Sequence, residues 1–413
     1  MSRVRQIKTN MDNKNAKNNE VLMLLKSIDP LLKLERCYGI FRFHIFDDHL
    51  GPINRMMKVY GICIMFAFTI PYCVLCFYSY SKIENFDTVA IVDALENFPP
   101  LIMALQYFIF IIISLQLHDK NILLIKKLAQ VDRILNVSMK KDFFENFHKD
   151  VQILLFLFLI SYTFSLIPDF FDIFNERNYY QIISVGIDFP LHLESLSFYI
   201  FIKILTVRLN ILNNHLIDLI KLKNQKNASP FIDINISNEN LNYTSNDSRA
   251  SHRNNKTIRL GEAYKIIGEA NYLINDIFEF QNFMSLVSTF VYIIITLWSS
   301  IYFYRTLKQL NLLLAFTVQC VYEIFIISLM SYICDVMSSE RNTTKILVNE
   351  LIVDYNLPKA IRIQAKTFME LIEVWPLKIF AYDMFPIDIK LILKFVSVST
   401  TFLIVIIQIS HFI

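Results

Sequence analysis

Residues 401–413 read TFLIVIIQISHFI, an almost purely aliphatic helix ending that carries one amide, Gln408. They close an apolar run that starts near residue 391, and a run of about 20 apolar residues crosses a bilayer as an α-helix. An amide without a hydrogen-bond partner is strongly unfavourable in hydrocarbon, so Gln408 must face a partner or water. The stretch therefore predicts a membrane helix that is more polar on one side than on the others.

The rest of the chain continues this hydrophobic pattern. It has 413 residues, of which 54% are hydrophobic and only 19% are charged, against about 25% charged in a soluble domain. Thirty-six Phe and six Gly favour long helices over turn-rich sheet. We therefore predict an all-α membrane protein with seven transmembrane helices, at about 57–80, 98–117, 151–171, 182–206, 283–304, 311–335 and 391–409.

The distribution of Lys and Arg predicts which way the helices point. Of the 40 Lys and Arg residues, 33 lie in four long segments and 4 in the short connections that alternate with them. Because cytosolic segments are enriched in these residues, we predict an intracellular N-terminus and an extracellular C-terminus. This orientation is opposite to that of G-protein-coupled receptors. The long segments are 1–56, 118–150, 207–281 and 336–390.

The predicted cytosolic segments combine helical patterns with one polar loop. Apolar residues at helical spacing in 120–135, 257–281 and 343–375 predict that the membrane helices extend into a cytosolic bundle. The polar range 222–258 predicts a disordered cytosolic loop. Its five Asn-X-Ser/Thr sequons would also suit an external glycosylated loop, although such triplets arise by chance in an Asn-rich stretch. We divide the chain into a cytosolic segment, 1–56, and a seven-helix domain, 57–413.

The sequence lacks the motifs of several function classes. A net charge of +3 gives no support for nucleic-acid binding. The six glycines form neither a P-loop nor a GxGxxG turn, and the chain contains no HExxH or GxSxG. The eight histidines do not follow metal-ligand spacing. We therefore predict no enzymatic activity, no cofactor and no metal site.

Small polar side chains share one face of the last predicted helix, since residues three or four apart align. One interpretation is that they hydrogen-bond to neighbouring helices. The other is that they line a water-filled path closed by aliphatic side chains. Because one helix cannot enclose a pore, the second interpretation requires several copies of the chain around a common axis. The candidate pore and gate residues are Ser397, Thr401, Val405, Gln408 and Ile409.

Polar and aromatic residues inside the other predicted spans form a second candidate site. Ionisable groups within a membrane usually face the interior of the helix bundle and often bind ligands. They can also pair with one another, as Asp188 and His192 would at a spacing of four residues, and aromatic residues can mark the membrane interface. Acids and amides beside aromatic walls suit either a sugar or a nitrogenous ligand. The candidate ligand-binding residues are Asp188, His192, Glu194, Gln319, Glu323, Tyr162 and Trp298.

Three stretches resemble a known family. Thr401-Phe402, five aliphatic residues and Gln408-Ile409 resemble the insect gustatory receptor signature TYhhhhhQF, with Phe402 in place of Tyr and Ile409 in place of Phe. The stretch KIFAYDMFPID, residues 378–388, is similar to the segment before that family's last helix. RLNILN, residues 208–213, is similar to the end of its fourth span.

The resemblance to gustatory receptors, part of the insect chemoreceptor superfamily, carries functional expectations. It implies a ligand-gated, non-selective cation channel in the plasma membrane of a sensory neuron, surrounded by lipid. It also implies a homotetramer, or a hetero-oligomer with related receptors, with Val405, Gln408 and Ile409 at the pore. A small-molecule tastant would bind in the outer half of the helices. The alternatives are an odorant receptor subunit of the same superfamily or a secondary transporter.

Overall fold

The computed structural model describes residues 2–46, 49–81, 98–137, 141–167, 180–227, 239–307 and 310–412. Nearly all of them are helical, which confirms the predicted all-α class. Two short hairpins are the exceptions, β1 (His44–Phe46) with β2 (His49–Gly51) and β3 (Phe380–Ala381) with β4 (Phe385–Pro386). The helices are α1 (Ser2–Cys37), α2 (Arg55–Ser81), α4 (Phe98–Gln116), α5 (His118–Ile134), α6 (Lys141–Ser165), α8 (Tyr180–Asn227), α9 (Glu239–Leu307), α10 (Leu310–Val353), α11 (Lys359–Val374) and α12 (Ile389–Phe412).

The seven predicted spans lie on seven separate helices, α2, α4, α6, α8, α9, α10 and α12. By length and composition, five helices among the described residues can cross a membrane, and α4 with α5 forms a sixth candidate, bent by 62°. The seventh predicted span lies on α12, which is not among these candidates but has 24 residues and no Asp, Glu, Lys or Arg after Lys394. The orientation of these helices in the membrane stays a prediction.

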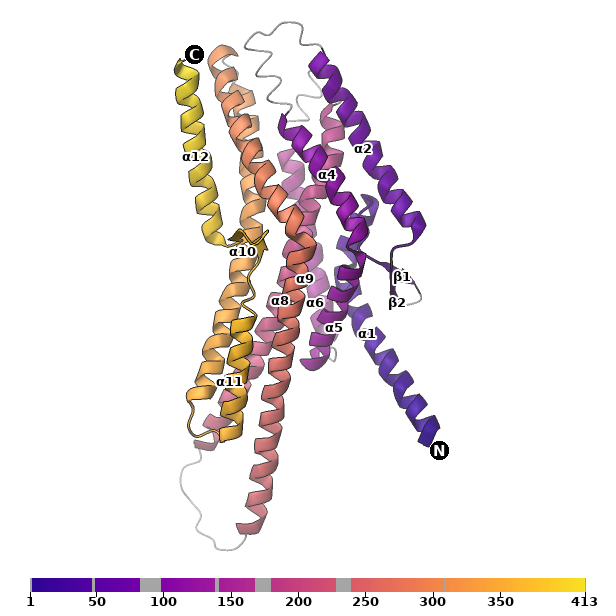
Figure 1. Cartoon of the computed structure of the whole chain (residues 1–413), viewed down its shortest axis with the longest axis vertical. Coiled ribbons are helices and arrows are strands. Elements are labelled where there is room, and N and C mark those ends of the chain that lie inside the picture. The colour runs from indigo at the N-terminus through magenta and orange to yellow at the C-terminus, as the bar shows by residue number, and fades with distance from the viewer. Residues whose placement is uncertain are drawn as a thin grey trace.

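Three helices are much longer than a bilayer is thick. α8, α9 and α10 have 48, 69 and 44 residues, and at about 1.5 Å per residue each exceeds the roughly 30 Å of hydrocarbon. Their lower parts form a bundle with α5 and α11, while the C-terminus lies at the opposite end, as Figure 1 shows. The predicted extension of the membrane helices into a second bundle therefore agrees with the observed architecture.

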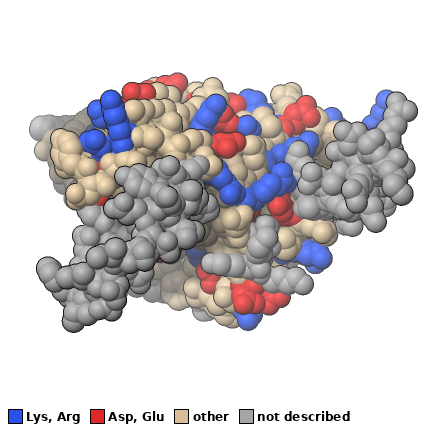
Figure 2. Space-filling view, turned by 90° about the horizontal axis from the view of Figure 1, so that it is seen from below, with Lys and Arg blue, Asp and Glu red and all other residues tan. Residues whose placement is uncertain are grey.

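The surface of the lower bundle is charged. Figure 2 shows Lys, Arg, Asp and Glu side chains on the end viewed from below. Ion pairs link neighbouring helices there, with 2.5 Å between Lys127 Nζ and Glu269 Oε2 and also between Lys120 Nζ and Asp276 Oδ2. Such side chains are unfavourable in hydrocarbon, so this bundle lies outside the bilayer core.

The helices extend further into the polar range 222–258 than the sequence predicts. α8 continues to Asn227 and α9 begins at Glu239, so helix replaces loop at both flanks. Helical spacing of apolar residues was a weak guide here, because a helix that projects into water needs no apolar face along its whole length. Residues 228–238 of the predicted loop lie outside the described residues.

α8 is the central helix of the fold. Of the 18 apolar residues that qualify α8 as a candidate span, 72% are buried, and α8 contacts α2, α4, α9 and α10. A helix that is apolar on all sides needs neighbours on all sides. Its Arg208 is also buried and pairs with Asp132 of α5, with 2.6 Å between Nη2 and Oδ2. The RLNILN stretch therefore includes a buried link between helices.

A face of α9 fixes the start of α12. The Tyr264 hydroxyl donates to the Trp375 carbonyl (2.8 Å), and Asn271 Nδ2 donates to the Lys378 carbonyl (3.2 Å). Asn275 Oδ1 accepts from the Phe380 amide at 2.9 Å. Between them lies Gly268, where an added Cβ would come within 2.6 Å of the Trp375 ring. These four α9 residues align along one helical face, so they hold the β3–β4 hairpin and set the direction in which α12 leaves it.

Candidate functional site

Helix α12 lies at the edge of the molecule and contacts its own subunit mainly through α9 and α10, as Figure 1 illustrates. The inner side includes Ser399, which is buried, and Phe395 and Phe402, whose rings lie 6.0 and 5.7 Å from that of Phe290 on α9. The opposite side has no cover in the described part of this subunit.

Four of the five predicted pore residues lie on this uncovered side or at its border. At 100° per residue, Ser397, Thr401 and Gln408 point away from Ser399, and all three side chains are exposed. Val405 is 44% exposed. The Ile409 backbone belongs to α12, but its side chain lies outside the described set. Ser397, Thr401 and Gln408, here called the polar stripe, therefore do not bind α12 to its own bundle. This argues against hydrogen bonding within the subunit as their role.

The hydroxyls and the amide of the stripe differ in what they need from their surroundings. Thr401 Oγ1 donates to the Ser397 carbonyl at 2.9 Å, and Thr400 Oγ1 donates to the Val396 carbonyl at 2.8 Å. Such bonds to the preceding turn let a threonine face an apolar environment at little cost. A glutamine amide has four hydrogen-bonding sites, so exposed Gln408 is the residue that most requires water or another subunit at this surface.

A small cavity in the bundle brings together part of the second candidate site. It has a volume of about 20 Å³, enough for one water molecule. His192 of α8 and Glu323 of α10 both line it, with 3.3 Å between Nε2 and Oε1. Thr289 Oγ1 of α9 donates to Glu323 Oε2 at 3.2 Å. Four helices meet here, because Gln106 of α4 completes the polar lining.

Aromatic rings surround the cavity histidine. The rings of Tyr162 and Tyr322 lie 5.9 and 5.2 Å from that of His192, and 6.0 Å from each other. All three residues are at most 6% exposed. The predicted residues Tyr162, His192 and Glu323 therefore come together in one buried cluster, to which the sequence analysis did not assign Thr289 or Tyr322.

His192 pairs with an acid that the sequence analysis did not predict as its partner. The carboxylate at 3.3 Å from His192 is that of Glu323, while Asp188 acts on the imidazole electrostatically. A spacing of four residues aligns Asp188 with His192 but carries no information about acids on other helices, such as Glu323 of α10.

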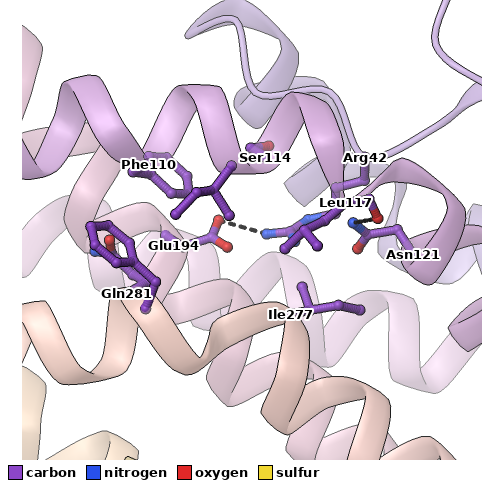
Figure 3. Close-up of a pocket in the computed structure, with 10 residues that line it drawn as sticks. Arg42, Phe110, Ser114, Leu117, Asn121, Glu194, Ile277 and Gln281 are labelled. Carbon is purple, nitrogen blue, oxygen red and sulfur yellow. Dashed lines mark hydrogen bonds and ion pairs between the residues drawn. The ribbon is translucent and has the colours of Figure 1, made fainter. Parts of the chain in front are cut away.

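Glu194 belongs to a different cluster. Figure 3 shows it directed at Arg42, with 2.6 Å between Glu194 Oε2 and Arg42 Nη2. Arg42 also pairs with Glu35 of α1 at 2.8 Å, and Ser197 Oγ donates to the same carboxylate at 2.5 Å. Because residues 192 and 194 are about 200° apart on the helix, they cannot share a pocket. Arg42 is not among the predicted site residues; it lies between two phenylalanines in a short loop.

The guanidinium of Arg42 is fully enclosed and remains charged. Burial by itself favours loss of its proton, but the carboxylates of Glu194 and Glu35 outweigh that effect and raise the pKa of Arg42 above its ordinary value. The Arg42 guanidinium carbon also lies 5.0 and 5.5 Å from the ring centres of Phe278 and Phe201. This cluster links α1 to α8 and borders a second cavity of about 10 Å³, separate from the one at His192.

The two remaining candidates lie apart from the described cavities. Gln319 is partly buried, one helical turn from Glu323 on α10. Trp298 is partly buried on α9, more than two turns from Thr289. Among the described residues, no group of three or more His, Cys, Asp or Glu side chains is arranged to hold a metal ion.

The chain matches known proteins over nearly its whole length. A profile of the 7tm chemosensory receptors matches residues 28–411. The solved structure of the insect olfactory receptor OR5 from Machilis hrabei is similar, with a TM-score of 0.62 and 11% sequence identity over 94% of this chain and 100% of that one. The structure of that receptor in complex with eugenol gives a TM-score of 0.54 and 12% identity at the same coverage. A comparison with curated proteins gives no match.

Proposed function

This chain belongs to the 7tm chemosensory receptor family, and from that premise we propose that it is a gustatory receptor acting as a ligand-gated, non-selective cation channel. Four copies surround a common axis, and a small tastant bound within each subunit opens the pore. Residues 57–413 form this channel domain behind a cytosolic segment, 1–56. The protein acts in the plasma membrane of a sensory neuron.

The observation that carries this proposal is the uncovered polar side of α12. Ser397, Thr401 and Gln408 point away from the subunit to which α12 belongs. In a monomer the Gln408 amide would face lipid, which is unfavourable. In a ring of subunits it faces water along the axis, with Val405 and Ile409 as the hydrophobic constriction that excludes water when the channel is closed.

The lower bundle offers a surface for assembly. Five large apolar side chains in residues 336–375 are half or more exposed, although the rest of that surface carries many charges: Ile346 (68%), Val353 (57%), Tyr355 (80%), Ile363 (50%) and Val374 (67%). Exposed apolar residues on a water-facing surface are typical of protein–protein contacts. Contacts between these residues of neighbouring copies would hold the subunits together outside the membrane, while α12 remains free to move within it.

A short path connects the cavity to the pore helix. Thr289 hydrogen-bonds to Glu323 at the cavity, and the next residue on α9, Phe290, contacts Phe395 and Phe402 of α12. A ligand that separates Glu323 from Thr289 would therefore displace α10 relative to α9. Since α12 rests on these two helices, the displacement reaches Val405 and Ile409.

Recording from cells that express this chain alone tests the proposal. We expect ligand-evoked cation currents, altered conductance in Gln408→Leu and altered gating in Val405→Ala. Thr400→Val serves as a matched control, because it changes a hydroxyl on the same helix beside the stripe. Unchanged conductance and gating in both pore variants would show that α12 does not line the pore.

The likeness to a solved olfactory receptor favours one alternative, an odorant receptor subunit with the same channel mechanism and a volatile ligand. A panel of volatile and non-volatile compounds distinguishes the two. A secondary transporter would instead show saturable uptake without unitary currents.

A further inference from the structure

The segment between α11 and α12, residues 375–388, is bound to α9 through its main chain. Asn275 Oδ1 accepts a hydrogen bond from the Phe380 amide at 2.9 Å, and Asn271 Nδ2 donates to the Lys378 carbonyl at 3.2 Å. Both asparagines are on α9, about one helical turn apart and on the same face. Because they contact backbone groups, this attachment does not depend on which side chains the segment carries.

The attached segment is itself held by hydrogen bonds and burial up to the first turn of α12. The Ile387 amide donates to the Ile379 carbonyl at 2.9 Å, and both side chains are buried. Asp388 then caps α12, since its side chain accepts from the Leu391 amide at 3.1 Å. The segment therefore passes a fixed position on α9 to the start of α12 over a few residues.

α10 also packs against α12, but its described contacts are of another kind. The described hydrogen bonds between residues 375–405 and the other long helices come from α9 and none comes from α10. The thiol of Cys334 on α10 lies near Asp388, with no described hydrogen bond between them. A hydrogen bond fixes the distance and direction of its partners, whereas packed helices can slide by small amounts. The start of α12 is therefore held more firmly to α9 than to α10.

We propose that Asn271 and Asn275 are positioning residues of the channel, which make α12 follow α9 rather than α10 when the pore opens. This inference rests on the proposed channel function and names the helix that carries the pore helix. Thr289 of α9 and Glu323 of α10 are joined at the cavity by a hydrogen bond. A displacement between α9 and α10 at that point therefore reaches the pore as a movement of α12 together with α9.

Substitutions at Asn275 can separate the hydrogen bond from the packing. Asparagine, aspartate and leucine are similar in size, but only the first two can accept a bond from the Phe380 amide. Asn275→Leu therefore removes the bond, and Asn275→Asp retains it. Asn271→Leu removes the second bond independently. Asn255→Leu, at an exposed asparagine of the same helix, is the matched control.

Hydrogen exchange on the purified full-length protein measures the attachment of α12 without any ligand. In Asn271→Leu and Asn275→Leu we expect exchange in residues 376–391 to rise about three- to tenfold, as for the loss of one hydrogen bond. Exchange in α8 should stay at the wild-type rate. Asn275→Asp and Asn255→Leu should exchange as the wild type does. Raised exchange in α8 identifies a folding defect, and the other leucine variant then decides.

Single-channel recording from the same proteins in a planar bilayer measures the effect on gating. In Asn275→Leu the open fraction should change at least about threefold, as for the loss of one hydrogen bond. The unitary conductance should stay at the wild-type value, because no pore-lining residue is altered. Asn275→Asp should restore the open fraction, since it restores the acceptor for the Phe380 amide.

Wild-type exchange of residues 376–391 in both leucine variants would overturn the inference, as would equal exchange in Asn275→Asp and Asn275→Leu. Raised exchange with an unchanged open fraction would also overturn it, because the two asparagines would then stabilise the fold without positioning the pore. If the wild-type protein never conducts, with or without the panel of volatile and non-volatile compounds, the channel proposal fails. The exchange result still decides in that case whether α9 holds α12.

Discussion

Helices α8 and α12 are both long apolar helices with scattered polar residues, yet α8 is mostly buried and α12 is mostly exposed. In α8, 72% of an 18-residue apolar stretch is buried, and its polar groups Arg208 and Glu194 form ion pairs with Asp132 and Arg42. In α12, Leu393 is 73% and Ile404 is 50% exposed, and the polar residues point outward. The difference teaches that one subunit completes the surroundings of α8, whereas α12 requires lipid, water or further subunits.

The largest expected effect concerns the buried ion cluster on α8. Arg42→Met leaves the carboxylates of Glu35 and Glu194 buried without their cation, which destabilises a protein by about 3–5 kcal/mol. We expect a clearly lower thermal unfolding temperature in detergent and reduced surface expression. Lys394→Met, on the exposed side of α12, removes a cation of similar size and should stay close to wild type.

A triple variant tests whether charge is the cause. Arg42→Met combined with Glu35→Gln and Glu194→Gln should recover much of the lost stability, because no uncompensated charge remains. If the triple variant unfolds as early as Arg42→Met, packing against Phe201 and Phe278 matters more than the ion pairs.

A matched pair of isoleucines, one on α8 and one on α12, tests the comparison through an effect of intermediate size. Ile204 on α8 is 0% exposed, and Ile404 on α12 is 50% exposed. Ile204→Thr places a hydroxyl in the core and should cost about 1–3 kcal/mol, whereas Ile404→Thr should stay within about 0.5 kcal/mol. Thermal unfolding of the purified variants measures both. Equal destabilisation would mean that α12 is as enclosed as α8, contrary to its position in Figure 1.

The smallest expected effect concerns two lysines at the start of α12. Lys390 and Lys394 are exposed and align with the polar stripe, so in a tetramer their charges would repel cations at one mouth of the pore. Replacing both with Gln should raise single-channel conductance by about twofold or less, most clearly at low ionic strength, where screening is weak. Lys378→Gln, an exposed lysine outside α12, provides the control. An unchanged conductance would place the two lysines away from the ion path.

The membrane fold could be predicted from local sequence because its signals are local. The seven apolar runs and the polar stripe on α12 follow from the helical repeat, which fixes which residues share a face. Three of the seven ligand-site candidates, Tyr162, His192 and Glu323, come together in the structure. They could be predicted because an ionisable or hydroxyl-bearing residue stands out within an otherwise apolar run.

The partners of those residues could not be predicted. Glu194 lies two residues after His192, and only the packing of α1 and its following loop against α8 directs it to Arg42 and Glu35. The pairing of His192 with Glu323 likewise depends on how α8 packs against α10. These contacts join residues distant in the chain, and helical periodicity carries no information on which neighbour a face will meet.

The sequence by itself determined that this chain forms long membrane helices, that its last helix has a polar side, and which family it resembles. Only the tertiary structure decided that this polar side faces away from its own subunit, and that a small cavity holding the His192–Glu323 pair lies between α4, α8, α9 and α10. The physical reason is that hydrophobicity and helical repeat act along the chain, whereas burial and charge balance depend on which helices pack together.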